Sequence, residues 1–429
     1  MQKLVIEGGH RLRGEVKTGG SKNAVLPILA ASILTREPLV LEGVPDLSDV
    51  DRMTEVLELL GAKAQRHPGG RLEVSCEGDL VAVAPWEQVR TMRGSVCVLG
   101  PLLARQGQAK VSLPGGCVFG VRPIDVHIKG LAALGAEITV EHGYVVAKAR
   151  GGRLRGATMY MGSSFGSSVL GTANVLMAAT LAEGRTVIHG AACEPEIVDL
   201  ANCLIAMGAH IQGHGSPTLT IDGVDELSGA THRVIPDRIE AGTYVLAGAI
   251  TGGAVKVTDC EPDHLRCLVD RLWEAGVPFD CGIDYIETFE HDPRERPPRS
   301  TDVSTNVYPG FPTDLQAQWM ALMTQADGIS IITERIYPDR WMHLPELERL
   351  GAEVRRQNTA AVVRGPARLS GAEVTASDLR ASAALVLAGL VAEGQTEVHR
   401  VYHIDRGYER IEERLKALGA NIWRTDERS

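Results

Sequence analysis

LSDVDRMTEVLELLGAKAQ, residues 47–65, combines an amphipathic helical pattern with a glycine at its end. Its apolar residues follow the spacing of one helix face: Val50, Met53, Val56, Leu57 and Leu60. Gly61 comes directly after them, at the place where a helix commonly ends on a residue with left-handed backbone angles. The stretch therefore predicts a surface helix that packs one face on a core and ends at Gly61.

The end of this helix recurs along the whole chain. The phrases are LELLGAKAQ, AALGAEITV, IAMGAHIQG, WEAGVPFDC, ERLGAEVRR and KALGANIWR, with the glycines Gly61, Gly135, Gly208, Gly276, Gly351 and Gly419. Successive glycines are 74, 73, 68, 75 and 68 residues apart. We expect six similar units, because a steady period marks repeated supersecondary structure. An α/β solenoid is the alternative, although solenoid units are usually shorter, roughly 20 to 50 residues.

A second phrase marks the start of a different kind of helix. It reads RLRGEV, RLRGAT, ELSGAT and RLSGAE, with the glycines Gly14, Gly156, Gly229 and Gly371. The stretches that follow are AVLPILAASIL, ANVLMAATLAEG, TYVLAGAITGG and ASAALVLAGLVAEG. Helices as apolar as these are buried on nearly every side. We therefore expect an α/β fold in which each group of three units wraps its sheets around inner helices, giving two similar domains with a cleft between them.

Composition narrows the class of protein. The 429 residues, 44% of them hydrophobic, predict two or three domains with a sizeable core, and the net charge of -10 argues against a duplex nucleic-acid binder. No secretory signal or membrane span is evident, so we expect a cytoplasmic protein.

Eight cysteines without a CxxC pair form neither a disulfide framework nor a zinc pattern, and Cys97 and Cys203 are expected to be buried.

GGCVFGVRPIDVHIKGL, residues 115–131, places one cysteine in a glycine-rich stretch. Cys117 is followed by Arg122, Asp125 and His127. A thiol near a guanidinium can have a lowered pKa and act as a nucleophile or acid, and a glycine loop can close over a substrate. A structural turn with an incidental cysteine is the alternative.

Two basic stretches suggest an anion site. GGSKNAVLPILA places Lys22 and Asn23 at the start of a buried helix, where backbone N–H groups already favour an anion. VRTMRGSVCVLGP carries Arg90, for which solvent is the expected surrounding, and Arg93, which faces either a neighbouring surface or a ligand. A solvated lysine near a helix cap is the alternative for Lys22.

Three acidic residues raise a similar choice. Asp314, in YPGFPTDLQAQWM, is interpreted as a helix N-cap that could also serve as a general base. TASDLRASAALVLAG pairs Asp378 with Arg380, and YHIDRGYERIEERL pairs Asp405 with Arg406. An arginine at a helix entry suits a phosphate or carboxylate ligand, and local salt bridges are the alternative.

The remaining motif search indicates the kind of ligand. The chain contains no HxxH, GxGxxG or GxxxxGK[ST] pattern, so neither a metal site nor a nucleotide-binding glycine loop of those classes is indicated. The cations that sit at the edges of different repeats are Lys22, Arg93, Arg122, Arg340, Arg380 and Arg406. This distribution in an acidic chain predicts a small substrate with several negative charges, held between two domains.

Longer motifs run along the chain in the order typical of one enzyme family. They are SKNAVLPIL, LPGGCVFGVRPIDVHIKGL, ATLAEG, EPEIVD, PDRIEAGT, FPTDLQAQ, HLPELERLGA, DLRAS and YHIDRGYERIEERLKALGANI. On these motifs the chain resembles the enolpyruvyl transferases, and among them the UDP-N-acetylglucosamine 1-carboxyvinyltransferases, which are related to EPSP synthase. The similarity covers essentially the full length.

The resemblance implies a fold and a reaction. The fold would be two inside-out α/β barrels built from six βαβαββ-like repeats, with domain I at residues 1–21 plus 230–429 and domain II at residues 22–229. The enzyme would close over phosphoenolpyruvate and UDP-N-acetylglucosamine, add the sugar 3′-hydroxyl to C2 of the enolpyruvyl group and eliminate phosphate, the first committed step of peptidoglycan synthesis. It would use no metal or organic cofactor and act as a monomer, without nucleic-acid or membrane partners.

The same resemblance implies roles for individual residues. Cys117 would protonate the enolpyruvyl carbon and accept the antibiotic fosfomycin, Asp314 would face the hydroxyl as a base, and Lys22 would take part in catalysis. The residues implied for phosphoenolpyruvate are Lys22, Asn23, Arg122, Arg380 and Arg406. The residues implied for the UDP-sugar are Arg93, Arg122, Pro123, Asp125, His127, Ser168, Val169, Asp314 and Ile336.

One segment departs from the family pattern. The family usually has a lysine or arginine shortly before Ser-Val-Gly, whereas this chain reads MGSSFGSSVLGTANVLMAA. Gly166 falls on the cationic position, and Leu170 stands where the glycine is expected. Another acceptor, such as uridine monophosphate, shikimate 3-phosphate or a different nucleotide sugar, is therefore an alternative. A catalytically silent paralogue that binds a nucleotide sugar is a third hypothesis.

Overall fold

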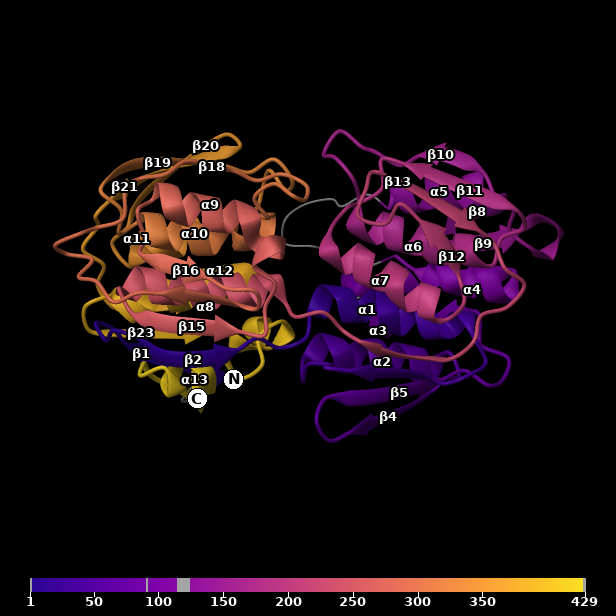
Figure 1. Cartoon of the computed structure of the whole chain (residues 1–429), viewed down its shortest axis with the longest axis horizontal. Coiled ribbons are helices and arrows are strands. Elements are labelled where there is room, and N and C mark those ends of the chain that lie inside the picture. Colours follow the sequence, from indigo (N-terminus) through magenta and orange to yellow (C-terminus); the bar gives the residue numbers. More distant parts are fainter. Residues whose placement is uncertain (1, 90–91, 114–123, 427–429) are drawn as a thin grey trace. The chain divides into compact units, whose positions relative to one another are not determined.

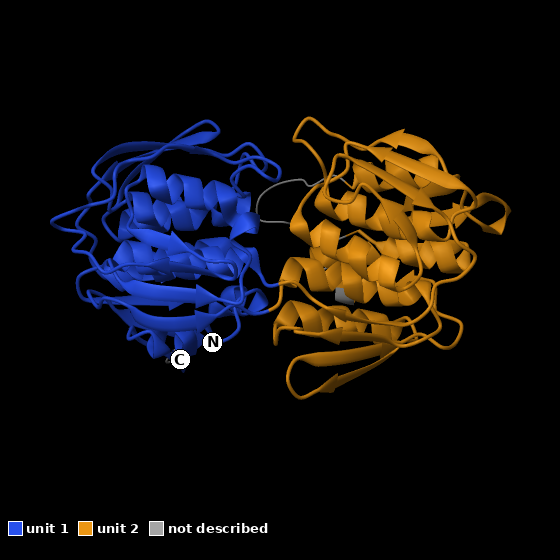
Figure 2. Ribbon diagram, viewed as in Figure 1, with its two compact units in different colours: residues 1–19, 236–429 blue, residues 20–235 orange. Residues whose placement is uncertain are grey.

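The chain forms two compact units, seen in a computed structural model that describes residues 2–89, 92–113 and 124–426. Unit 1 contains residues 1–19 and 236–429, and unit 2 contains residues 20–235 (Figure 2). The chain passes between the units at 19/20 and again at 235/236. These crossings lie close to the expected boundaries at 21/22 and 229/230.

Unit 1 contains three four-stranded sheets in the described part of the chain (Figure 1). Their strand orders are β22 (Glu373–Thr375), β23 (Gln395–His399), β1 (Gln2–Glu7), β24 (Asn421–Asp426); β2 (Arg13–Lys17), β15 (Ala254–Thr258), β17 (Tyr285–Thr288), β16 (Phe279–Cys281); and β18 (Val303–Ser304), β19 (Gly328–Thr333), β21 (Ala360–Gly365), β20 (Glu353–Gln357). In each sheet the first pair is parallel and the other two pairs are antiparallel. The three sheets of unit 1 therefore share one pairing pattern.

Three helices fill the middle of unit 1. They are α8 (Arg238–Thr251), α10 (Gln316–Met323) and α12 (Leu379–Val391), and each contacts the other two. Every residue of α10 is buried, as are nearly all residues of α8 and α12. The outer helices are α9 (Arg266–Glu274), α11 (Leu344–Arg349) and α13 (Ile411–Ala417), with short 3-10 helices η4 (Pro262–Leu265), η5 (Thr313–Leu315) and η6 (Val401–Arg406). The prediction of fully buried apolar helices is confirmed.

Unit 2 repeats this plan in its own described residues. The strand orders are β10 (Thr158–Tyr160), β11 (Arg185–His189), β13 (Thr218–Asp222), β12 (His210–Gln212); β14 (Ala230–Arg233), β3 (Leu39–Glu42), β5 (Arg71–Ser75), β4 (Lys63–His67); and β6 (Val83–Ala84), β7 (Gln108–Ser112), β9 (Tyr144–Ala149), β8 (Ala136–Glu141). Again the first pair of each sheet is parallel and the rest are antiparallel. The two units thus share the strand arrangement of all three sheets.

The helices of unit 2 follow the same division. The inner helices are α1 (Lys22–Ala31), α4 (Leu99–Gln106) and α6 (Val169–Thr180), and the outer ones are α2 (Ser48–Leu59), α5 (Asp125–Ala133) and α7 (Pro195–Ala206). Shorter turns are α3 (Trp86–Val89), η1 (Ser32–Leu34), η2 (Arg93–Val98) and η3 (Arg150–Gly152). Cys97 and Cys203 are buried here, as predicted. No helix in the described residues is both long and apolar enough to cross a membrane.

The glycines that end the outer helices have a common conformation. All have a positive φ: Gly61, Gly135, Gly208, Gly276, Gly351 and Gly419. L side chains rarely adopt this conformation, so glycine is the residue that ends these helices without strain. On α2, Val50, Met53, Val56 and Leu57 are buried, which confirms the helix predicted from that stretch.

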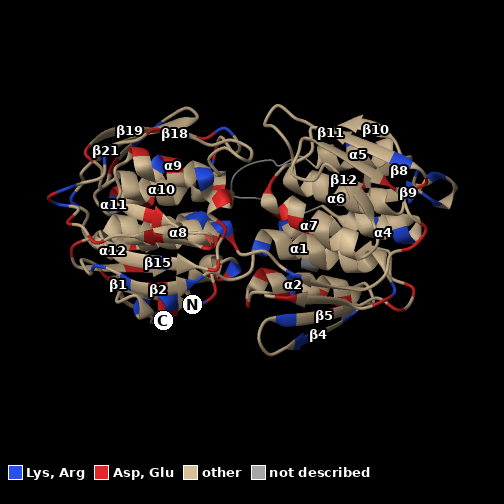
Figure 3. Ribbon diagram, viewed as in Figure 1, with Lys and Arg blue, Asp and Glu red and all other residues tan. Residues whose placement is uncertain are grey.

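Charged residues on the inner helices, coloured along the ribbon in Figure 3, are confined to helix ends. In α1, α8 and α12 they occur only in the first turn, and α6 and α10 carry none. The buried parts of these helices supply apolar packing. In α1, α8 and α12 the charged groups are therefore concentrated where the helix begins.

Candidate active site

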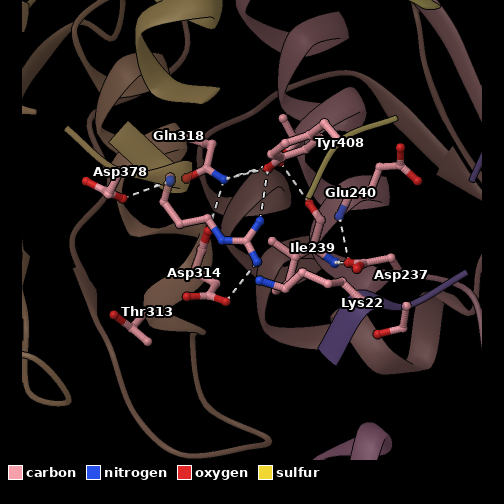
Figure 4. Close-up of polar contacts among 12 residues, drawn as sticks. Lys22, Asp237, Ile239, Glu240, Thr313, Asp314, Gln318, Asp378 and Tyr408 are labelled. Carbon is pink, nitrogen blue, oxygen red and sulfur yellow. Dashed lines mark hydrogen bonds and ion pairs between the residues drawn. The ribbon is translucent and has the colours of Figure 1, made fainter. Parts of the chain in front are cut away.

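Asp314, which is labelled in Figure 4, forms the centre of a charged cluster in unit 1. Its Oδ1 lies 2.7 Å from the guanidinium of Arg340, and its Oδ2 lies 2.9 Å from that of Arg380. The side chains of Arg340 and Arg380 are 8% and 4% exposed, against 25% for Asp314. Two buried guanidiniums thus share one partly exposed carboxylate.

The interpretation of Asp314 as a helix cap is wrong. Pro312 occupies the N-cap position of η5, and no side chain caps this turn. Asp314 lies inside the turn instead, so its carboxylate can reach the two arginines. The local pattern could not reveal this, because these partners lie 26 and 66 positions further along the chain.

Arg380 is held at the start of α12. Asp378 is the N-cap residue, and its Oδ1 accepts hydrogen bonds from the backbone N–H groups of Arg380 and Ala381 at 2.9 and 3.2 Å. Burial lowers the pKa of the Arg380 guanidinium, but Asp314, together with the smaller effects of Tyr408 and Asp237, raises it by more, so the net pKa is raised. Arg380 therefore remains a cation although it is buried.

A neutral network supports Arg380 from the other side (Figure 4). Its guanidinium donates to the hydroxyl of Tyr408 at 3.3 Å, and that hydroxyl lies 2.8 Å from the hydroxyl of Thr243. The amide of Gln318 donates to both hydroxyls, at 3.3 and 3.2 Å, and to the backbone carbonyl of Asp314. Burial raises the pKa of Tyr408, which keeps its phenol protonated. The network fixes the direction of Arg380.

Glu334 is a buried carboxylate that sequence reasoning missed. It accepts hydrogen bonds from the hydroxyls of Thr305 and Thr313, at 2.7 and 2.9 Å, and from the backbone N–H groups of Ile336 and Tyr337. Thr313 also accepts from Arg340 at 2.9 Å. The half-buried Ile336, implied to lie near the UDP-sugar, is thereby tied to the turn that carries Asp314.

Glu240 is a second buried acid of unit 1, near the first chain crossing. Its carboxylate accepts from the backbone N–H of Gly19 at 2.7 Å and pairs with Arg414 at 3.0 Å. Burial raises the pKa of Glu240 to about 7, because desolvation outweighs the opposing effect of Arg414. The neighbouring Asp237 caps α8 through the N–H groups of Ile239 and Glu240.

The basic start of α1 lies in unit 2, as predicted. Ser21 is the N-cap and Lys22 the first helical residue, followed by the half-buried Asn23. The ammonium of Lys22 lies 3.4 Å from the carboxylate of Asp49, whose other oxygen lies 3.7 Å from Arg52. Lys22 is thus held at the helix N-terminus by a buried acid.

His127 and Arg93 form the other polar part of unit 2. His127 lies buried on α5, with Nδ1 2.9 Å from the amide nitrogen of Asn174 on α6. Burial, with a further contribution from the positive charge of Arg93, lowers the pKa of His127 to about 4. The imidazole is therefore neutral near pH 7. Asp125 is the exposed first residue of the same helix.

The segment that departs from the family pattern begins α6. Ser168 is the N-cap, and its hydroxyl accepts from the N–H of Gly171 at 3.2 Å. Val169 is the first helical residue. Gly166, which stands at the family's cationic position, has φ +93°. The helix start is intact, but it carries no cation at this point.

The remaining predicted residues divide into two groups. Asp405 pairs with Arg424, at 2.7 and 2.9 Å, so the adjacent Arg406 is not its partner in this ion pair. Arg406 is half-buried at the end of η6, and its charge helps to lower the pKa of His403 after the larger effect of burial. The residues that lie outside the described part are Arg90, Cys117, Arg122 and Pro123.

Comparisons with known proteins show the family to which the chain belongs. A family model described as EPSP synthase (3-phosphoshikimate 1-carboxyvinyltransferase) matches residues 6–415. A UDP-N-acetylglucosamine 1-carboxyvinyltransferase of Koribacter versatilis is 51% identical over 430 residues, covering 100% of this chain and 97% of the relative. The protein of the same name from Anaeromyxobacter sp. (strain Fw109-5) is 54% identical over 429 residues, covering 99% of each.

Solved structures extend the comparison to the fold. The enolpyruvyl transferase NikO from Streptomyces tendae is 27% identical, with a TM-score of 0.88 over 99% of both chains. EPSP synthase from Acinetobacter baumannii is 17% identical, with a TM-score of 0.74 over 99% of this chain and 100% of that one, a likeness that shows the fold alone. Because the family model and the relatives cover nearly every residue described above, this chain belongs to the EPSP synthase family of enolpyruvyl transferases.

Proposed function

We propose that this protein transfers the enolpyruvyl group of phosphoenolpyruvate to the 3′-hydroxyl of UDP-N-acetylglucosamine and releases phosphate, the first committed step of peptidoglycan synthesis. The observation that carries the proposal is the identity of 51% and 54%, over the full length, with two relatives named for this activity. The cluster of Asp314 with Arg340 and Arg380 supports it, because such a site suits an anionic substrate next to a base.

We further propose that each unit is an inside-out α/β barrel of three βαβαββ repeats, and that the substrates bind in the cleft between the two domains. The shared pairing pattern of the sheets and the three buried helices in each unit support the repeats. Domain I would be residues 1–21 plus 230–429, and domain II residues 22–229. That the protein is a cytoplasmic monomer and needs no metal or organic cofactor stays a prediction.

The proposed roles follow the charges of the substrates. Phosphoenolpyruvate carries a phosphate and a carboxylate, for which the proposed residues are Lys22, Asn23, Arg122, Arg380 and Arg406. For the UDP-sugar they are Arg93, Arg122, Pro123, Asp125, His127, Ser168, Val169, Asp314 and Ile336. Arg380, beside Asp314, would take the carboxylate, since a guanidinium binds a carboxylate through two parallel hydrogen bonds.

In the proposed reaction each bond that forms or breaks at C2 and C3 is accompanied by a proton transfer that balances it. Asp314 accepts the proton of the sugar hydroxyl while the hydroxyl oxygen bonds to C2 of phosphoenolpyruvate. Cys117 gives a proton to C3. The Cys117 thiolate then takes a proton back from C3 of the tetrahedral intermediate, the carbon–carbon double bond re-forms, and the bond between C2 and the phosphate oxygen breaks. Phosphate leaves with the proton that Asp314 had accepted. Lys22 and the arginines stabilise the negative charge that moves onto the phosphate.

The arrangement around Asp314 gives this scheme a physical order. A carboxylate held by two guanidiniums is a weak base, because both ion pairs favour its charged form. A substrate carboxylate that binds Arg380 would compete for one of those pairs. Binding of phosphoenolpyruvate would therefore strengthen Asp314 as a base before the hydroxyl is deprotonated.

One assay tests the proposed activity against its alternatives. Phosphate release from phosphoenolpyruvate is measured with UDP-N-acetylglucosamine, uridine monophosphate or shikimate 3-phosphate as acceptor. Release with the UDP-sugar alone is the expected result. Release with uridine monophosphate but not with the UDP-sugar would overturn the choice of acceptor, and no release with any of them would favour a silent nucleotide-sugar-binding paralogue.

A further inference from the structure

Asn174 is a buried polar residue in the middle of an apolar helix. It lies on α6, in the run ANVLMAAT, and has no exposed surface. An amide in such a place costs free energy unless its hydrogen-bonding groups find partners. The partners of Asn174 therefore show what the residue contributes.

The hydrogen bonds of Asn174 determine which way its amide points. Its Oδ1 accepts from the backbone N–H of Gly100 at 2.7 Å, and its Nδ2 donates to the backbone carbonyl of Val96 at 2.8 Å. A backbone N–H can only donate and a backbone carbonyl can only accept. The two contacts therefore exclude the flipped amide, in which like groups would face each other.

This orientation decides the proton on His127. The same Nδ2 lies 2.9 Å from Nδ1 of His127, and an amide nitrogen is a donor, so Nδ1 must accept. A neutral imidazole whose Nδ1 accepts carries its proton on Nε2. The lowered pKa of about 4, caused by burial and then by Arg93, keeps the ring neutral near pH 7.

Close packing holds the three elements in register. A Cβ on Gly100 would lie 2.3 Å from the backbone oxygen of Asn174, and one on Gly130 would lie 2.4 Å from a methyl group of Val175. Only glycine permits such approaches, so α4 and α5 both lie tightly against α6. Val96 belongs to η2, the turn that begins at Arg93. One amide thus links the elements that carry Arg93 and His127.

We propose that Asn174 is a positioning residue of the nucleotide site, which holds His127 as the neutral Nε2–H tautomer so that this N–H donates to an oxygen of the nucleotide. The inference deepens the proposed function and rests on it for the identity of the ligand. Uracil carbonyls and phosphate oxygens are acceptors, so an unprotonated Nε2 would repel them. In the described residues the side chain of His127 is hydrogen-bonded through Nδ1, to Asn174, and Nε2 is the donor that the proposal assigns to the ligand.

The substitution Asn174→Asp tests the tautomer directly. A carboxylate keeps the size of the amide but can only accept, so it should move the proton of His127 to Nδ1. Nitrogen-15 NMR of the imidazole, without any nucleotide, is expected to show protonated Nε2 in the wild type and protonated Nδ1 in the variant. The same tautomer in both proteins, or protonated Nδ1 in the wild type, would overturn the proposal.

Kinetics of the same variant separate positioning from general damage. Loss of one donor to the nucleotide should raise KM for UDP-N-acetylglucosamine about tenfold, with kcat changed much less. The control Asn202→Asp makes the same change in charge on an exposed residue of α7 and should leave both parameters unchanged. Equal KM values for Asn174→Asp and wild type would contradict the role in nucleotide binding.

A second pair of variants covers the case in which Asn174→Asp does not fold. The side-chain amide of His127→Gln can place an N–H near the former Nε2, whereas that of His127→Asn reaches only the former Nδ1. KM for the UDP-sugar should be raised less in His127→Gln than in His127→Asn, and the reverse order would contradict the proposal. If wild type is inactive with the UDP-sugar but shows protonated Nε2, the proposed function fails while the tautomer assignment stands.

Discussion

The polar cluster of unit 1 is built from charges, whereas that of unit 2 around His127 is built mainly from neutral groups. In unit 1 the Asp314 carboxylate holds two buried guanidiniums, which leaves one net positive charge among the three side chains. In unit 2 an amide, a neutral imidazole and backbone groups meet, with Arg93 nearby. Similar scaffolds therefore carry two kinds of polar cluster. In the proposed function the first would stabilise charge that develops during the reaction, and the second would orient a polar ligand.

The largest effect is expected from replacement of Cys117. This change tests whether unit 2 supplies a proton that complements the proposed base, Asp314, in unit 1. Cys117→Ala should abolish alkylation by fosfomycin and reduce phosphate release to a trace, because the variant lacks the thiol. Mass spectrometry of the treated protein measures the adduct. An adduct on a different cysteine would show that the assignment is wrong.

Replacement of Cys117 by Asp sharpens the same test. A carboxylic acid is a proton donor of similar reach, so Cys117→Asp should retain turnover and lose sensitivity to fosfomycin. Complete inactivity of this variant would mean that the thiol does more than donate a proton.

The next largest effect is expected from loss of Asp314, the proposed base in unit 1. Asp314→Asn should lower kcat roughly 10²- to 10⁴-fold, because the amide cannot accept the hydroxyl proton and no longer balances Arg340 and Arg380. Phosphate release measures the effect. Asp339→Asn, on an exposed aspartate of the same unit, is the control and should be close to wild type. A kcat within tenfold of wild type would remove Asp314 from the role of base.

The two units should respond to pH in opposite ways at their buried acid and buried histidine. The pKa of His127 is lowered to about 4, so the free energy of unfolding from this group is lost as pH falls below the ordinary value of 6.5. The pKa of Glu240 is raised to about 7, so its contribution is lost as pH rises above the ordinary value of 4.5. Each shift amounts to roughly 3 kcal/mol at most.

Neutral variants isolate these two contributions. Relative to wild type, His127→Gln should lose less stability between pH 6.5 and 4, and Glu240→Gln should lose less between pH 4.5 and 7. Urea unfolding at a series of pH values provides the measurement. Curves for wild type and variant that stay parallel across the stated window would contradict the corresponding shift.

The smallest effect is expected from a change that keeps the charge of unit 1. Arg380→Lys retains a cation but loses the planar pair of donors, which should raise KM for phosphoenolpyruvate about tenfold. Arg368→Lys, at an exposed arginine, serves as the control. An unchanged KM would show that a point charge at position 380 is sufficient. The cluster of unit 1 would then depend on charge alone, in contrast to the cluster around His127, which depends on the direction of hydrogen bonds.

Local patterns predict the scaffold better than the site. The helix-end glycines and the apolar helices follow from short-range periodicity, and they agree with the positive φ angles and the burial of these helices. The pattern around Asp314 indicates a helix cap, which is wrong. Its arginine partners are distant in sequence, so the local pattern does not contain them. Asp405 likewise pairs with Arg424 and not with its neighbour.

The roles of two residues that support the polar clusters cannot be predicted from their neighbours in the sequence. Glu334 gathers groups from separate turns, and Asn174 bonds to residues 47 to 78 positions away. The signal for Asn174 in the sequence is an amide in an otherwise apolar helical run. A polar residue in a helix that is otherwise apolar therefore indicates a position where distant elements meet around a site.

The position of strand β1 affects the order in which the protein can fold during synthesis. This N-terminal strand pairs with β23 and β24. The sheet β22-β23-β1-β24 of unit 1 is therefore incomplete until residues 421–426 have left the ribosome. Unit 2 is contiguous from residue 20 to residue 235 and is complete far earlier. Domains generally fold as units during synthesis. Unit 2 should therefore be folded in the nascent chain while β1 and β2 are still unpaired.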